Sequence, residues 1–332
     1  MPFTKNFRTP GQLTGIARGA FDAEFERFRV SGLLPAVENF TLDYSFNVGS
    51  APLPPAAKFR AFNAESMVNR LGTGQTAKGS LPPTSIRMHV DEYTQLKLMG
   101  QDDAIGQKFE QYAIANAQSI AFRIIIAAAQ AIVDGKITLA ERGLQLDIDF
   151  GRKAGLKANA ATVWSNTAAS LPISDLEALR NVLGKRVSQT ILSRVTLGYL
   201  QRNVDLMKLI LGKGSDLPSR VSSDDVISFL GSEGFGQVVV DEDTVPDTTG
   251  TEVPLFAADK VILISGSQVG TTEIGVTTEA IESENGIGNS DAPGLFSGAI
   301  ASSDPSGYDV YVGGILLPTL TSPDNTAVLD AF

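Results

Sequence analysis

Residues 102–152 read DDAIGQKFEQYAIANAQSIAFRIIIAAAQAIVDGKITLAERGLQLDIDFGR and contain two patterns that decide the fold. The first, over 102–134, predicts a helix of about nine turns that becomes steadily more apolar toward 124–133. At 1.5 Å per residue it would span roughly 50 Å, more than a compact enzyme domain needs. Such a helix is typical of a shell subunit built as a flat plate.

The second pattern is a hairpin that follows the helix directly and alternates with a period of two. One face carries apolar residues and the other polar residues: Leu144, Leu146, Ile148 and Phe150 against Gln145, Asp147 and Asp149. The hairpin closes at Gly151-Arg152, and Arg152 with Lys153 and Lys157 forms a small basic patch that we expect on a solvated face.

Composition limits the class of protein. The chain has 332 residues, 43% of them hydrophobic, which suffices for a sizeable core in two or three lobes. It has no cysteine, which excludes disulfides, thiolate catalysis and zinc–sulfur sites. The amino terminus lacks the apolar run of a signal peptide. The apolar end of the long helix, interrupted by Arg123 and Gln130, is predicted to be too short for a bilayer, so we expect a soluble protein without a membrane partner.

Charge is distributed unevenly along the chain, whose net charge is −10. Residues 1–220 hold 26 of the 27 basic and 19 of the 37 acidic side chains, a net +7, whereas 221–332 hold only Lys260 against 18 acidic groups, a net −17. Regions of opposite charge allow copies of a protein to attract each other, although a balance within one subunit explains the split equally well. A net-negative chain is also a poor sequence-specific DNA binder.

The amino-terminal hundred residues look irregular. Residues 1–38 predict an arm of short amphipathic pieces interrupted by glycines, and 40–46 predict a strand with Phe40, Leu42, Tyr44 and Phe46 on one face. An excursion over 48–93, with a flexible tip at 71–80, has too few apolar residues for a core of its own. A loop of this kind is expected to dock on a neighbouring subunit.

The rest of the chain alternates short elements. Predicted helices begin at Pro172 and cover 199–211 and 223–230, and predicted strands cover 187–192, 237–240, 261–264, 273–278 and 308–312.

No catalytic set emerges. The single histidine, His89, alternates with Arg87 and Asp91 on a predicted solvated strand face and has no evident nucleophile. The acidic run 241–243 with Asp247 offers oxygen ligands for a hard cation, but its spacing fits no ligand loop, which favours an exposed turn. We therefore expect no catalytic residue, no metal and no cofactor.

Several short motifs in a shared order resemble the lambda-type major capsid protein E family of tailed phages. They are the long helix followed by 135–138, the hairpin end 147–152, Trp164-Ser165, Pro172 with Asp175, then 258–263 and 275–279, and finally 314–318 with 322–324. The resemblance covers about 20–332 and is thin before residue 100.

The resemblance implies an α+β architecture, the Hong Kong ninety-seven coat fold. Its implied parts are an N-terminal arm with the first strand (1–48), an extended E-loop (49–93), the spine helix with the peripheral domain (94–185), an axial domain (186–300) and a peripheral return strand with the C-terminus (301–332).

The implied function is a major capsid protein that self-assembles, as pentamers and hexamers, into the icosahedral head of a tailed bacteriophage around double-stranded DNA. Its expected partners are itself, a scaffold, a portal, decoration proteins and DNA bound without sequence specificity. It would be assembled in the host cytoplasm and reside in the virion.

Charged residues are the candidates for contacts between subunits: Lys58, Arg60, Arg70, Lys78, Arg87, Asp102, Asp103, Asp241, Glu242 and Asp243. Two alternatives stay open. One is a nanocompartment shell of the same fold with an enzyme as cargo. The other is a metal-assisted hydrolase that uses the acidic cluster.

Overall fold

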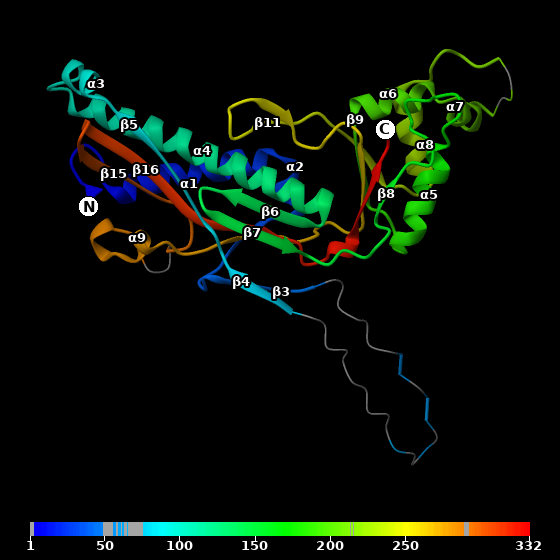
Figure 1. Cartoon of the computed structure of the whole chain (residues 1–332), viewed down its shortest axis with the longest axis horizontal. Coiled ribbons are helices and arrows are strands. Elements are labelled where there is room, and N and C mark those ends of the chain that lie inside the picture. Colours follow the sequence, from blue (N-terminus) through cyan, green and yellow to red (C-terminus); the bar gives the residue numbers. More distant parts are fainter. Residues whose placement is uncertain are drawn as a thin grey trace.

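The computed structural model describes residues 3–48, 56, 57, 59, 60, 62, 65, 76–212, 214, 216–288 and 292–332, and Figure 1 shows how their elements are arranged. The described helices are α1 (Pro10–Arg27), α2 (Arg29–Leu33), α3 (Glu92–Lys97), α4 (Asp102–Asp134), α5 (Pro172–Leu183), α6 (Arg194–Arg202), α7 (Val204–Leu211), α8 (Ser223–Ser232) and α9 (Thr278–Ile281).

Strands β1 to β9 are Phe3–Thr4, Ala36–Glu38, Asp43–Asn47, Thr76–Ser80, Pro83–Val90, Lys136–Glu141, Leu144–Asp149, Lys157–Asn159 and Gln189–Ser193. Strands β10 to β17 are Gln237–Asp241, Thr244–Pro246, Glu252–Pro254, Lys260–Ile264, Thr271–Ile274, Phe296–Ser303, Ser306–Thr319 and Thr326–Asp330.

Helix α4 confirms the predicted long helix, residue for residue. Asp102 and Asp103 lie in its first turn, where carboxylates interact favourably with the helix dipole. It ends at Gly135, whose φ of 69° is the left-handed conformation that closes many helices. The predicted hairpin follows as β6 and β7, with Ile137 opposite Ile148 and Phe150 fully buried, so the apolar face does point inward.

By length and composition α4 is able to cross a membrane, which corrects the prediction that its apolar part is too short. In the fold, however, 61% of its most apolar window is buried inside the molecule. The helix is therefore the core helix of a packed lobe.

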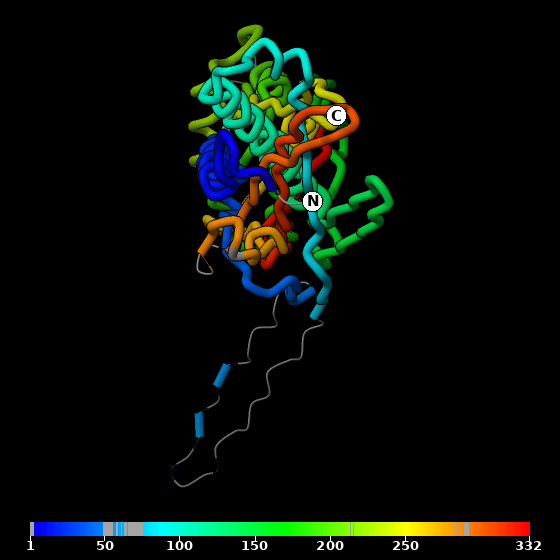
Figure 2. The backbone as a smooth tube through the Cα atoms, turned by 90° about the vertical axis from the view of Figure 1, so that its left-hand side faces the viewer, coloured from blue at the N-terminus to red at the C-terminus, as the bar shows by residue number. Residues whose placement is uncertain are grey.

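The first lobe surrounds α4. Its six-stranded sheet has the order β1-β15-β16-β14-β2, with β5 also paired to β16. Helices α1 and α4 pack on each other and on this sheet, and they lie side by side in both views (Figures 1 and 2). The core between them includes Phe21, Phe109, Ile125 and Val312.

The second lobe lies at the opposite end of the long axis from the N-terminus (Figure 1). Its sheet has the order β10-β9-β13-β17-β8, and helices α5, α6 and α8 pack around its core with Trp164, Leu200 and Phe235. The other face of this sheet, with Ile191, Ile262 and Val328, belongs to the core of the first lobe. The sheet is thus a wall shared by both lobes.

The two cores group the chain differently from the predicted block 186–300. The second core takes residues from 156 to 263 and again from 327 to 331. Strand β14 lies in the sheet of the first lobe, and so does β15, which spans the predicted boundary at 300. The C-terminal strand β17 lies inside the second sheet, because it pairs with β13 about 66 residues earlier, a partner that no local pattern indicates.

Four local predictions are wrong in detail. Residues 10–27 form one helix despite three glycines, because Thr9 and Gln12 make a reciprocal cap and α4 packs along it. The helix predicted over 199–211 is broken at Asn203, whose side chain caps α7. Strand β14 ends at Ile274, before α9 begins. Phe40 and Leu42 are exposed and precede β3, in which Tyr44 and Phe46 are buried.

The predicted excursion is more ordered at its return than expected. Residues 76–80, assigned to a flexible tip, form β4 and pair with β3. Residues 83–90 form β5, which pairs along eight residues with β16 in the first sheet. Residues 71–75 of the predicted tip lie outside the described residues.

Candidate functional site

The one histidine is half-buried and paired, so the predicted solvated strand face is wrong there. His89 lies opposite Asp309 on β16, with 2.7 Å between His89 Nδ1 and Asp309 Oδ1. Arg87 reaches the same carboxylate at 3.4 Å. Asp91 caps α3 and is not part of the strand. Within the described ranges, no three His, Asp or Glu residues are grouped to hold a metal ion.

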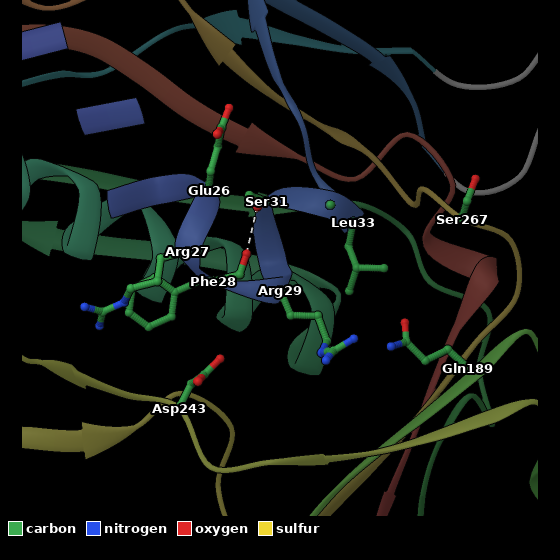
Figure 3. Close-up of a pocket in the computed structure, with 10 residues that line it drawn as sticks. Glu26, Arg27, Phe28, Arg29, Ser31, Leu33, Gln189, Asp243 and Ser267 are labelled. Atoms are coloured by element: carbon green, nitrogen blue, oxygen red, sulfur yellow. Dashed lines mark hydrogen bonds between the residues drawn. The ribbon is translucent and has the colours of Figure 1, made fainter. Parts of the chain in front are cut away.

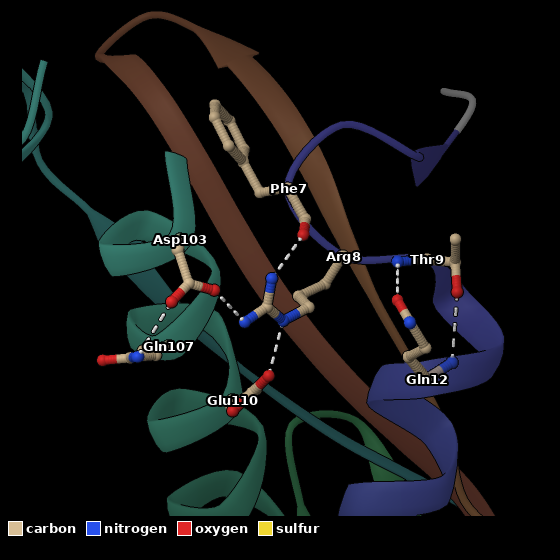
Figure 4. A network of polar contacts seen from close by, with 7 residues as sticks. All are labelled: Phe7, Arg8, Thr9, Gln12, Asp103, Gln107 and Glu110. Carbon is tan, nitrogen blue, oxygen red and sulfur yellow. Dashed lines mark hydrogen bonds and ion pairs between the residues drawn. The ribbon is translucent and has the colours of Figure 1, made fainter. Parts of the chain in front are cut away.

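The first residues of the chain form an N-terminal strap, which we define as Phe3–Arg8. Its guanidinium, on Arg8, donates to Asp103 at 2.8 Å, to Glu110, and to the carbonyl of Phe7 at 2.9 Å (Figure 4). Asp103 was predicted to contact a neighbouring subunit, but here it pairs within its own chain. Sequence reasoning missed Arg8, since nothing local marks its partners about 100 residues away.

Apolar contacts hold the strap as well. The ring of Phe3 lies 4.9 Å from that of Phe296, and the ring of Phe7 lies edge-on to those of Phe109 and Tyr308, at 5.7 and 5.6 Å. Phe3 and Thr4 form β1, which adds two residues to the edge of β15. The strap therefore ties the start of the chain to α4, β15 and β16.

Arg152 is half-buried and donates to backbone carbonyls, so its prediction as part of a solvated basic patch is wrong. It donates to the carbonyls of Val133 (2.9 Å), Ala131 (3.3 Å) and Ile132, at the last turn of α4. Burial lowers the pKa of Arg152 to about 10, which still leaves it charged at neutral pH. A cation at this helix end satisfies carbonyls that lack helical partners. Lys153 and Lys157, by contrast, are exposed.

An open polar cleft of about 580 Å³ lies where the two lobes meet. Residues 26–33, at the corner between α1 and α2, form one wall, and Gln189, Asp243 and Ser267 form the other (Figure 3). Beside the cleft, burial and then the charge of Asp243 raise the pKa of Asp241 to about 6, against the opposing effect of Arg29. The acidic run 241–243 is therefore partly buried beside the cleft, whereas the sequence favoured an exposed turn.

The other charged candidates are dispersed over the described part of the chain. Glu242 forms an ion pair with Arg194, and this hydrogen bond lowers the pKa of Glu242. Lys78 on β4 and Asp102 are exposed, as is Arg60. Lys58 and Arg70 lie outside the described residues.

Among the exposed large apolar side chains, three groups stand out that charge-based reasoning did not single out: Val37, Phe40 and Leu42 near β2; Tyr93, Leu96 and Met99 at α3; and Phe59 and Phe62 in the excursion. The last two are 108% and 102% exposed, so no residue in the described part of the chain covers them. Apolar groups of this size are expected to find cover in a complex.

One family model matches most of the chain. The family model described as phage major capsid protein E matches residues 54–330. No curated protein sequence matches the chain.

Solved structures share the fold at low sequence identity. One, described as a prophage capsid protein from E. coli CFT073, is 13% identical with a TM-score of 0.62, covering 95% of this chain and 99% of its own. A phage-related protein from Bordetella bronchiseptica RB50 is 13% identical with a TM-score of 0.54, covering 96% and 95%. A chain of the satellite phage P4 procapsid is 11% identical with a TM-score of 0.50, covering 94% and 90%.

Proposed function

The chain belongs to the phage major capsid protein E family, and from that premise we propose how its surfaces build a phage head. The family assigns it a structural role as a subunit that associates with copies of itself in the virion capsid. This role, in place of catalysis, agrees with the expectation from the sequence. It also favours a phage head over the two alternatives, a nanocompartment shell and a metal-assisted hydrolase.

We propose that the subunits form pentamers and hexamers that close into an icosahedral head around double-stranded DNA. Assembly would take place in the host cytoplasm, with scaffold, portal and decoration proteins as further partners. In the terms of the coat fold, α4 serves as the spine helix and the second lobe as the axial domain. The E-loop is proposed over 49–93 and the N-terminal arm with the first strand over 1–48.

The observation that carries this proposal is the full exposure of Phe59 and Phe62. Burying one phenylalanine side chain is worth about 1.5–3 kcal/mol, so two uncovered rings favour association strongly. A loop that reaches over the next subunit covers both. Such a contact is heterologous, since one surface meets a different surface of the next copy, and repetition of it extends around a ring.

The net charge of the chain supports a shell that encloses DNA without binding it sequence-specifically. The net charge of −10 leaves little to neutralise phosphates, and phosphate neutralisation supplies most DNA affinity. Nuclease treatment of purified particles tests this point. A nuclease-resistant genome inside the particles is expected, whereas particles that hold an enzyme and no nucleic acid would favour the nanocompartment.

Assembly is tested by negative-stain microscopy and size-exclusion chromatography of the purified chain. Capsomers, shells or tubes are expected, and a strictly monomeric species at high concentration contradicts the proposal. The double variant Phe59→Ser, Phe62→Ser should keep the circular dichroism of the native fold but lose closed shells.

The matched control is Leu171→Ser, which removes an exposed apolar side chain from the second lobe and should still close shells. Equal assembly of the double variant and the native chain would show that the loop makes no essential contact.

A further inference from the structure

We propose that helix α3 pairs antiparallel with α3 of a second copy of the chain, across a twofold axis of the shell. The pairing rests on the proposed head, because icosahedral symmetry contains such axes. It identifies the outer face of α3 as an interaction surface and the identical face of a second copy as its occupant.

One face of α3 packs on its own chain. Thr94, Gln95 and Leu98 are half-buried, and Leu98 lies against the first core. Gln95 Nε2 also donates to the carbonyl of Val90 at 3.0 Å. These contacts fix which side of the helix faces the first lobe, so the opposite side faces outward.

The outer face carries an apolar stripe, which we define as Tyr93, Leu96 and Met99. A spacing of three residues brings side chains to neighbouring positions on one side of a helix, and Met99 continues the last turn by donating its N–H to the carbonyl of Leu96 at 3.3 Å. The three side chains are 72%, 69% and 78% exposed, and α3 has no buried residue. A helix of six residues is marginal in water without packing, so the stripe favours a partner.

The place and size of the stripe suit a contact within an assembly. Helix α3 lies at one end of the long axis, opposite the second lobe (Figure 1). Three side chains of this kind present roughly 400 Å², less than the about 800 Å² that each partner buries in a stable interface. Such a contact is too small to hold two free chains together. It is expected where the other contacts of a shell already bring copies close.

Charge favours an antiparallel arrangement over a parallel one. Glu92 lies in the first turn of α3 and Lys97 in the last, both are exposed, and neither forms an ion pair with another described residue. An antiparallel pair brings Glu92 of each copy to the level of Lys97 of the other and opposes the two helix dipoles. A parallel pair would place like charges at the same level. The face is thus self-complementary, as a twofold contact requires.

Introduced cysteines report this geometry, since the chain has no cysteine of its own. At 1.5 Å per residue, Tyr93 and Met99 lie roughly 4.5 Å to either side of Leu96 along the helix. In an antiparallel pair, Leu96 therefore meets Leu96 and Tyr93 meets Met99. The two copies of Tyr93 are about 9 Å apart along the axis, as are those of Met99, which is too far for a disulfide.

Assembled shells of each variant are oxidised and run on a denaturing gel without reductant. Leu96→Cys shells should give a band at twice the chain mass. Shells from an equal mixture of Tyr93→Cys and Met99→Cys chains should give the same band more weakly, because only mixed pairs can link. Tyr93→Cys shells and Met99→Cys shells, each on their own, are the matched controls and should run as single chains.

Other arrangements at α3 give other patterns, and each overturns the proposal. A parallel pair, or a threefold cluster in which like residues meet, would link the Tyr93→Cys and Met99→Cys chains on their own. Random collision of exposed thiols would link these controls as strongly as the mixture. A different protein over the stripe, or solvent alone, would leave every sample as single chains.

The same samples separate this inference from the proposed function. Shells that lack the predicted pattern overturn the pairing and leave the capsid role intact. If micrographs show no shells, the capsid role fails, and oxidation of the soluble chains at high concentration then decides the pairing. The predicted pattern of links would support pairing in solution, and single chains throughout would overturn it.

Discussion

The first lobe collects its elements from both ends of the chain, whereas the second lobe is nearly contiguous. In the first, β1 pairs with β15 almost 300 residues later, and β5 pairs with β16 across more than 200. In the second, β9 and β10 pair at a separation of 48 residues with three helices between them. Only β17 comes from far away.

The two lobes nevertheless share one wall. Strand β13 is buried on both faces, with Ile262 in the first core and Leu263 in the second. Strands buried on both faces read as continuous apolar runs, as Val261–Ile264 does. The difference in connectivity therefore does not imply two independent units. It indicates a slow-forming first lobe and a more local second lobe that depend on the same sheet.

The largest effects are expected from the wall itself. Ile262→Ala and Leu263→Ala truncate adjacent, fully buried side chains on opposite faces of β13, and each should cost about 2–5 kcal/mol of unfolding free energy. Urea unfolding is followed by circular dichroism, to which the helices of both lobes contribute, and by the fluorescence of Trp164, the only tryptophan, in the second core. Both signals should shift together in both variants.

In Ile262→Ala, the unfolding midpoint followed by circular dichroism could shift while the midpoint followed by Trp164 fluorescence stays unchanged. That result would contradict the view that the two lobes depend on one shared sheet. The lobes would then unfold separately.

A somewhat smaller loss is expected from Arg152, which belongs to the first lobe alone. Arg152→Met removes the donor to the carbonyls of Val133 and Ile132 at the end of α4, and the free energy of unfolding should fall by about 3 kcal/mol. Urea denaturation measures it. Lys153→Met is the matched control, because Lys153 is the exposed neighbour and its loss should change stability by about 0.5 kcal/mol or less. Equal losses in the two variants would show that the carbonyl contacts are unimportant.

Asp241, at the junction of the lobes, should make the stability of the protein depend on pH. Its pKa is about 6 in the fold and near 3.8 when unfolded. Between these values the folded chain holds the proton that the unfolded chain has released, so stability falls as pH rises from about 4 to 6 and stays lower above that range.

Asp241→Asn removes this charge. After a discount for partial exposure, it should stabilise the protein by about 1–2 kcal/mol at pH 8 and hardly at pH 4. Thermal unfolding at both pH values tests the prediction, and an equal effect at pH 4 and pH 8 would contradict it.

The smallest effect is expected at the surface of the first lobe. The guanidinium of Arg87 is largely exposed and 3.4 Å from Asp309, so Arg87→Ala should change stability by about 0.5 kcal/mol or less. A chemical denaturation curve is sufficient to measure this. A loss of several kcal/mol would mean that the β5–β16 pair depends on charge more than on its strand register.

Elements with a strong local signal were predictable, and sites that depend on distant partners were not. The period of the hairpin placed Ile148 and Phe150 inward, as found. Arg152 and the exposed Lys153 are adjacent basic residues, so the sequence does not distinguish them. Only the position of the last turn of α4 shows that Arg152 is half-buried. Gly11, Gly15 and Gly19 predicted interruptions, but the contact with α4 outweighs their low helix propensity.

The sequence by itself determined the long helix, the hairpin, the α+β class, the charge split and the family resemblance, because each depends on spacing within a short window or on composition. The tertiary structure alone decided where β17 and β5 belong, which acidic residue is buried, and that Arg8 ties the chain start to α4. These outcomes depend on which distant segments exclude water from each other, and the free energy of that burial is a property of the packed pair, absent from either segment alone.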